Sequence, residues 1–364
     1  MLNESNATDE SEDRSSTPHA GAPVWKRAAQ VVIAGIVVVG LVLAGRSSVQ
    51  NWRLQTTKIE AEIASLEKAI SEQPDDAAGR SMSDRVATLK TSLPSFANIR
   101  WGRVAASAVI YALGLLPSAM LLHRAVTSLG GRPKWSTAIV AQTLGHVGKY
   151  VPGKAMVIVL RGGVLARDGV QPLTATIGVF LETFLMMAVG AVVAAVATVN
   201  LELPRWISIT AIVTAVLAGL PTLPPILRRV AIRVTRVSPQ SSDRNIGWSL
   251  FASGWAWSLL SWLLIGASFT VLITAIPSAD PLPQITSLYP IATAAISLAM
   301  VVGFASLLPG GAGVRELVLT SVLGVAIGPV HSLLVAVAAR IVFMVVEAGL
   351  AAACWIWLKS HPAE

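Results

Sequence analysis

Two stretches of this sequence combine proline, glycine and charge inside otherwise apolar runs. The first reads Gly-His-Val-Gly-Lys-Tyr-Val-Pro-Gly-Lys over residues 145–154, and the second reads Leu-Leu-Pro-Gly-Gly-Ala-Gly-Val-Arg-Glu over residues 307–316. Proline removes a backbone donor and glycine permits a sharp bend, so we expect a helix to break at each stretch. Unpaired backbone at membrane depth must face protein or a wet cavity, and paired breaks in two halves of a membrane protein indicate a substrate site.

Charged side chains surround or follow each break. A charge within a membrane span is costly and marks function by default, although a structural ion pair that fixes helix packing is the alternative interpretation. Arg340 precedes Glu347 by seven residues, so the two are expected on a similar helix face. The candidate substrate-binding residues are Lys149, Tyr150, Pro152, Gly153, Lys154, Arg161, Glu182, Pro309, Gly310, Gly311, Gly313, Arg315, Glu316, Arg340 and Glu347.

Several other signals argue against enzymatic chemistry. Residues 148–154 spell G-x-x-x-x-G-K, but Ala155 follows where a phosphate-binding loop needs Ser or Thr to hold magnesium. His146 has no second ligand at helical spacing, so one interhelical hydrogen bond is expected instead of a metal site. The chain has five histidines and one cysteine, and no catalytic triad or cysteine metal site can be assembled from them. The sequence therefore predicts no cofactor, no metal and no enzymatic activity.

The elements that must position these residues are membrane helices. Hydrophobic residues make up 54% of the 364 positions and charged residues 13%, against about 25% charged in soluble domains. The apolar residues form long runs with tryptophans at several ends, as an aromatic belt predicts. The fold class is therefore all-α, a polytopic transmembrane helix bundle with two Pro-Gly-broken segments, re-entrant or discontinuous. The runs cover 104–122, 136–160, 173–199, 206–227, 248–276, 288–308, 316–328 and 330–358.

Charge places the loops. The net charge is +8, and because the basic residues lie between apolar runs, lipid head groups explain them better than nucleic acid does. The five arginines in 228–244 predict a cytoplasmic loop, which places the insert 46–100 outside the cytoplasm. The expected domains are a disordered acidic tail (1–23), an uncleaved membrane anchor (24–45), an extracytoplasmic helical stalk (46–100), a transmembrane domain (101–359) and a short tail (360–364).

The insert carries an apolar stripe of its own. Trp52, Ile59, Ile63, Leu66 and Ile70 share one helical face with heptad character. Fewer than three heptads are present, so a stalk helix that packs on its neighbour is favoured over a coiled coil. Such a stalk offers a surface for an extracytoplasmic protein partner.

The two broken segments resemble those of the lysylphosphatidylglycerol synthase transmembrane-domain family, also called the flippase-like family. The resemblance covers about residues 100–358, and Leu-Pro-Gly-Gly-Ala-Gly-Val-Arg-Glu at 308–316 is its more specific motif. It implies a domain associated with moving lipids across the bilayer, including aminoacylated phosphatidylglycerol. The soluble aminoacyl-transferase domain of bifunctional members is absent, which argues against lipid aminoacylation by this chain, and residues 24–100 look like an addition.

The sequence thus predicts a multi-pass lipid flippase or transporter of the inner or plasma membrane, with an anionic or aminoacylated lipid as its substrate. The cationic residues Lys149, Lys154, Arg161 and Arg315 are expected to bind phosphate. The glutamates Glu182, Glu316 and Glu347 are expected to pair with them or to meet a cationic head group. Two alternatives stay open: a catalytic or accessory subunit for polyprenyl-linked glycolipid or glycosyl transfer, and a membrane scaffold for envelope assembly that holds a partner through 46–100.

Overall fold

The described part of the chain is helical. A computed structural model describes residues 56–72, 77–92, 96–150, 155–199, 204–226, 229, 247–278, 281–306, 308, 311 and 313–361, and no strand occurs among them. The all-α prediction is therefore confirmed, while the expected tail 1–23 and anchor 24–45 lie outside the described residues. The helices of the bundle are α3 (Trp101–Ser128), α4 (Trp135–Gly148), α5 (Ala155–Leu165), α6 (Pro172–Val199), α7 (Arg205–Gly219), α10 (Trp248–Ala275), α11 (Ile285–Ala305), α12 (Val314–Ile327) and α13 (Pro329–Ser360).

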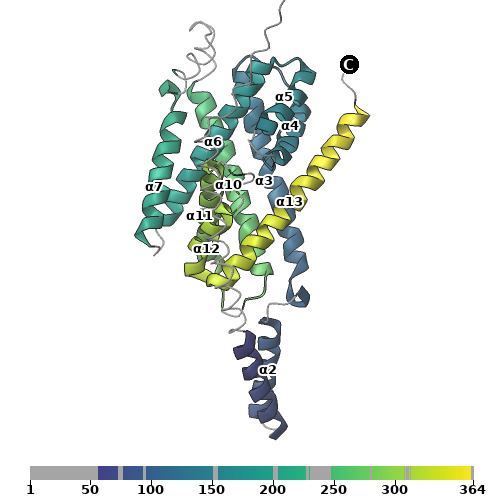
Figure 1. Cartoon of the computed structure of the whole chain (residues 1–364), viewed down its shortest axis with the longest axis vertical. Coiled ribbons are helices and arrows are strands. Elements are labelled where there is room, and N and C mark those ends of the chain that lie inside the picture. Colours follow the sequence, from purple (N-terminus) through teal and green to yellow (C-terminus); the bar gives the residue numbers. More distant parts are fainter. Residues whose placement is uncertain are drawn as a thin grey trace, which may run out of the picture.

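Six of the described helices are long and apolar enough to cross a membrane, namely α3, α6, α7, α10, α11 and α13. This confirms a multi-pass membrane protein. Helices α4, α5 and α12 have 14, 11 and 14 residues, which is too short to span. Helices α4 and α5 pack on each other in the upper part of Figure 1, and α12 lies in the lower part against α11 and α13.

The two predicted breaks coincide with the ends of these short helices. Helix α4 ends at Gly148 and α5 begins at Ala155, whereas α11 ends at Ala305 and α12 begins at Val314. Pro152, Gly153, Lys154, Pro309 and Gly310 lie outside the described residues, so the Pro-Gly geometry itself stays a prediction.

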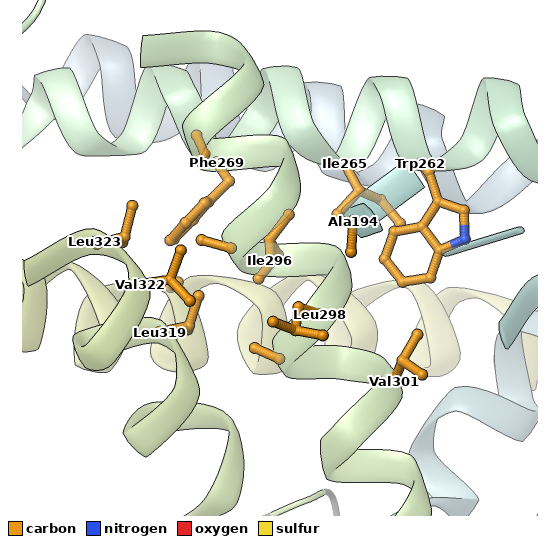
Figure 2. Packing of buried hydrophobic residues seen from close by; sticks show 14 of the residues in the cluster. Ala194, Trp262, Ile265, Phe269, Ile296, Leu298, Val301, Leu319, Val322 and Leu323 are labelled. Carbon is orange, nitrogen blue, oxygen red and sulfur yellow. The ribbon is translucent and has the colours of Figure 1, made fainter. Parts of the chain in front are cut away.

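The centre of the bundle is built on close approach of α3 and α10. Ser107 and Ser268 hydrogen-bond across the pair at 3.0 Å, and Ser261 Oγ donates to the Gly114 carbonyl at 2.6 Å. Small residues let helix backbones come this close in a membrane, where apolar burial does not drive helix association. Figure 2 shows the large side chains that fill the remaining space, with Trp262 and Phe269 of α10 facing residues of α11 and α12.

Six tryptophans lie at or near helix ends and are exposed on the surface of the bundle. Trp101, Trp135 and Trp248 begin α3, α4 and α10, and Trp206 is the second residue of α7. With Trp355 and Trp357 near the end of α13, all six are more than one third exposed. This arrangement fits the aromatic belt that the sequence predicts at the membrane interfaces.

A short helical hairpin projects from one end of the bundle (Figure 1). Its two helices, 56–72 and α2 (Ala77–Ser92), enclose a small core in which Ile63 packs with Val86 and Leu89. The described part of the stripe packs within the hairpin, with Ile63 buried and Ile59, Leu66 and Ile70 partly buried. Trp52 lies outside the described residues, and a coiled coil is not confirmed. At the base, the Arg100 backbone N–H donates to the Ala275 carbonyl at 3.0 Å, and the Arg103 guanidinium donates to the Thr274 carbonyl. These bonds join the start of α3 to the end of α10.

Candidate functional site

Described residues that flank both predicted breaks contact the middle of α13. Lys149, which follows α4, donates from Nζ to Glu347 Oε1 at 2.5 Å. Arg340 donates from Nη1 to Oε1 of Glu316, in the first turn of α12, at 2.6 Å. Arg340 and Glu347 are seven residues apart, about 10 Å along a helix axis. Segments separated by more than 150 residues of sequence therefore meet at one helix.

Glu347 is the acceptor at the centre of this meeting point. It is 1% exposed and accepts hydrogen bonds from the Tyr111 hydroxyl at 2.5 Å and the Tyr150 hydroxyl at 2.8 Å, in addition to Lys149. Tyr111 is also buried, and its ring stacks on Phe343 with centroids 3.8 Å apart. A buried carboxylate is tolerated only when paired and hydrogen-bonded, and these three donors meet that need. The Lys149 side chain keeps 26% of its surface exposed, so this cluster has an open side.

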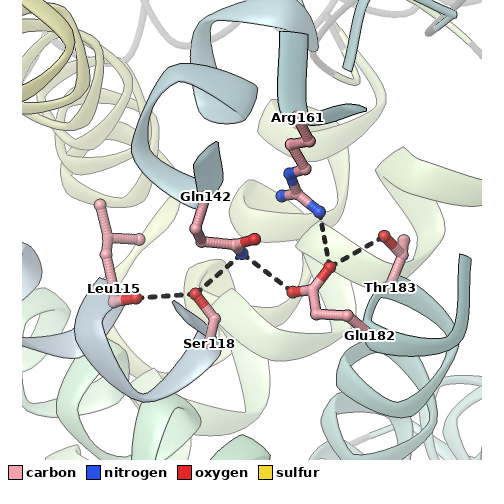
Figure 3. A network of polar contacts seen from close by, with 6 residues as sticks. All are labelled: Leu115, Ser118, Gln142, Arg161, Glu182 and Thr183. Carbon is pink, nitrogen blue, oxygen red and sulfur yellow. Dashed lines mark hydrogen bonds and ion pairs between the residues drawn. The ribbon is translucent and has the colours of Figure 1, made fainter. Parts of the chain in front are cut away.

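A second cluster is closed on all sides. Arg161 of α5 donates from Nη1 to Glu182 Oε2 at 2.6 Å, and both side chains are at most 6% exposed. Gln142 bridges Glu182 Oε1 at 2.9 Å and the Ser118 hydroxyl at 3.0 Å, while Thr183 donates to Glu182 Oε2. Figure 3 shows how this chain of contacts joins α3, α4, α5 and α6. The cluster ties four helices together around one compensated charge.

The Arg340–Glu316 pair is less enclosed than the pair in Figure 3. The Arg340 side chain is 27% exposed and that of Glu316 is 11% exposed. Glu316 Oε2 also accepts the backbone N–H of Gly313 at 2.7 Å, so this carboxylate caps the start of α12 as well as pairing with α13. Gly313 has φ +81°, a left-handed conformation that glycine adopts without steric cost.

Arg315 has no hydrogen-bond or ion-pair partner among the described residues. Its aliphatic stem lies over two glycines: a Cβ added to Gly303 would lie 2.5 Å from Arg315 Cγ, and one added to Gly311 would lie 3.0 Å from it. The guanidinium is close enough to interact electrostatically with Lys149, Tyr111 and Tyr150. Arg315 is therefore a partly buried cation beside the Glu347 cluster, unpaired within the described part of the chain.

Arg161 is seated on glycine in the same way. A Cβ added to Gly145 of α4 would collide with the Arg161 side chain. In each half of the molecule, an arginine side chain thus packs on a glycine near the predicted break.

The structure brings most of the predicted site residues together. Ten of them lie in or beside the three glutamate clusters, namely Lys149, Tyr150, Arg161, Glu182, Gly311, Gly313, Arg315, Glu316, Arg340 and Glu347. Pro152, Gly153, Lys154, Pro309 and Gly310 lie outside the described residues. Their role in binding a substrate stays a prediction.

Four participants were missed from the sequence: Tyr111, Gln142, Ser118 and Thr183. The available signal was a hydrogen-bonding side chain in the middle of an apolar run, but a single polar residue does not name its partner. His146 behaves differently from expectation, because its Nε2 is buried with no hydrogen-bond partner among the described residues. The residues that precede Gly148 form helix α4, whereas a phosphate-binding loop follows a strand.

Comparison with known proteins supplies a family. No curated protein matches the chain. Residues 84–348, well over half of the chain, match the family described as the lysylphosphatidylglycerol synthase TM region. The match includes the second helix of the hairpin in part, both interruptions and every glutamate of the three clusters. The chain therefore belongs to the lysylphosphatidylglycerol synthase transmembrane-region family.

Proposed function

We propose that this protein is a lipid flippase or transporter that moves a lipid with an anionic head group across the bilayer. The observation that supports it most directly is Arg315, a cation at the interrupted helices with no partner among the described residues. A charge within a span costs roughly 2.5–3.5 kcal/mol on insertion scales, so an unpaired one needs a reason. A phosphate that visits the site supplies that reason, because guanidinium and phosphate pair through two parallel hydrogen bonds.

The position of the site supports transport rather than attachment at one surface. Tyr111, Glu182 and Glu347 lie near the middle of the long helices α3, α6 and α13. A head group held there has left one interface and has not reached the other. Substrate sites of membrane transporters lie near the midplane, at helices that are interrupted in both halves of the protein.

The test is translocation of labelled lipid in liposomes that contain the purified protein. Arg315→Ala should lower the rate at least about tenfold, because the ligand of the phosphate is lost, and should leave thermal stability in detergent unchanged. Arg315→Lys keeps the charge but loses the planar fork, so an intermediate rate is expected. Arg85→Ala is the matched control, since Arg85 is a solvent-exposed arginine of the hairpin. Normal transport by folded Arg315→Ala would contradict the role of Arg315, whereas no translocation by the wild-type protein would contradict the transport function.

We further propose that the protein resides in the inner or plasma membrane with the insert 46–100 on the extracytoplasmic side, where it binds a protein partner. The five arginines of 228–244 support this orientation, and the hairpin supports a partner because it projects beyond the bundle. A cysteine placed at Ser71, in a background where Cys354 is replaced, should react with an impermeant reagent added outside intact cells. A cysteine at Ser241 should react only after the membrane is opened, and the reverse pattern would overturn this orientation.

A further inference from the structure

The charges at the site do not cancel. Each of the three glutamates holds one cation at 2.5–2.6 Å, in the pairs Arg161–Glu182, Arg340–Glu316 and Lys149–Glu347. Arg315 remains without such a partner in the part of the chain that the structure describes. The described site therefore carries one unbalanced positive charge and no unengaged carboxylate.

Each carboxylate also accepts two or three hydrogen bonds. Glu182 accepts from Gln142, Arg161 and Thr183, and Glu347 accepts from Tyr111, Lys149 and Tyr150. Glu316 is held by Arg340 and by the backbone N–H of Gly313. An ammonium group that entered the site would find each of these carboxylates already paired with a lysine or an arginine. It would therefore add a second unbalanced positive charge at membrane depth, which is unfavourable.

We propose that the site selects lipids by head-group charge: it takes a phosphodiester with one negative charge and no ammonium, with the phosphate on Arg315. This rests on the proposed transport function and names its substrate class. The aliphatic stem of Arg315 packs on Gly303 and Gly311, and its guanidinium has no partner among the described residues. A head group that also carries an amino acid, and so an added positive charge, is disfavoured, because every described carboxylate of the site is engaged. The favoured chemistry occurs both on glycerolipids and on polyprenyl-linked sugars.

The experiment compares labelled lipids in liposomes that contain the purified full chain. The arms are phosphatidylglycerol, its lysyl ester with the same acyl chains, and a polyprenyl phosphate that carries one neutral sugar. At least one of the two phosphodiester anions should move at least about tenfold faster than the lysyl ester, because like charges brought together in a desolvated site oppose binding strongly. Whichever anion moves identifies the source of the phosphodiester.

Two variants test whether Arg315 sets this preference. Arg315→Gln removes the unbalanced charge and should reduce the preference to less than about twofold, with thermal stability in detergent as the folding check. Glu316→Gln acts in the opposite direction: glutamine can still cap α12, but Arg340 loses its counter-charge, so the preference for the anion should increase.

The outcomes separate this inference from the transport function. Movement of the lysyl ester at the same rate as the anions, or faster, overturns the charge selection while transport stands. An unchanged preference in Arg315→Gln overturns the assignment of the phosphate to Arg315. If the wild-type protein moves none of the three lipids, the transport function and the inference fail together.

Discussion

Both halves of the molecule place an arginine on a glycine, but the two arginines differ in their counter-charge. In the first half, Arg161 packs on Gly145 and forms an ion pair with Glu182, and both side chains are almost fully buried. In the second half, the glutamate of α12 pairs with Arg340 instead, and Arg315 is pressed on glycine with no partner among the described residues. The first arrangement joins helices, whereas under the proposed function the second holds a cation for the phosphate of a lipid. An arginine beside a glycine does not by itself predict a ligand site, because its counter-charge must be considered as well.

The largest effect should come from opening the closed cluster. Glu182→Leu leaves Arg161 buried without a counter-charge, and breaking a buried pair on one side costs about 3–5 kcal/mol. We expect the unfolding free energy to fall by that amount, or the protein to fail to accumulate in the membrane. The measurement is thermal or denaturant unfolding in detergent, with Glu62→Leu in the hairpin as the exposed control. If Glu182→Leu is stable and has lost only transport, Glu182 contacts the substrate. The first half would then not be purely structural.

The next largest effects should come from alanine substitutions of the glycines under the two arginines, and they should differ between the halves. Gly145→Ala forces the enclosed Arg161 side chain to move, and overpacking of this kind costs about 1–3 kcal/mol. Gly303→Ala displaces Arg315, which is less enclosed, so transport should fall more than stability does. Gly102→Ala is a matched control, because nothing lies within 4 Å of a Cβ added there. Equal stability losses in Gly145→Ala and Gly303→Ala would show that both arginines are packing elements.

A smaller effect is expected at the more open pair. Glu316→Gln removes the counter-charge of Arg340, but the Arg340 side chain is 27% exposed and the cap on the Gly313 N–H can be kept. We expect a stability loss of about 1 kcal/mol, between the values for exposed and buried pairs. The comparison with Glu182→Gln, measured by the same unfolding assay, gives the contrast directly. A larger loss in Glu316→Gln would reverse our assignment of the closed and open halves.

The smallest effect belongs to the hairpin. Arg85 and Glu62 pair at 3.3 Å with about half of each side chain exposed. Exposed pairs contribute about 0.2–1 kcal/mol, so Arg85→Ala should change unfolding of the bundle little and lipid movement not at all. A marked loss of transport in this variant would mean that the stalk takes part in translocation.

Much of the fold could be predicted from the sequence, because several apolar runs begin and end close to where the helices begin and end. The run predicted at 173–199 is α6 (Pro172–Val199), and the short run predicted at 316–328 is the 14-residue α12 (Val314–Ile327). Proximity of charge to the breaks also identified most residues of the three clusters. The pairing within them did not follow: Arg340 and Glu347 were placed on a similar face, yet Arg340 binds α12 and Glu347 binds Lys149. Helical spacing fixes a direction from one helix, but the partner depends on which neighbouring helix arrives there.

The clamp at the base of the hairpin has a mechanical consequence. Arg100 and Arg103 tie the root of the stalk to the last turn of α10, and the serine bonds hold α10 to α3 along their length. A force applied to the hairpin would therefore act on α3 and α10 together. Tyr111 of α3 donates to Glu347, so such a force would also reach the carboxylate at the centre of the bundle.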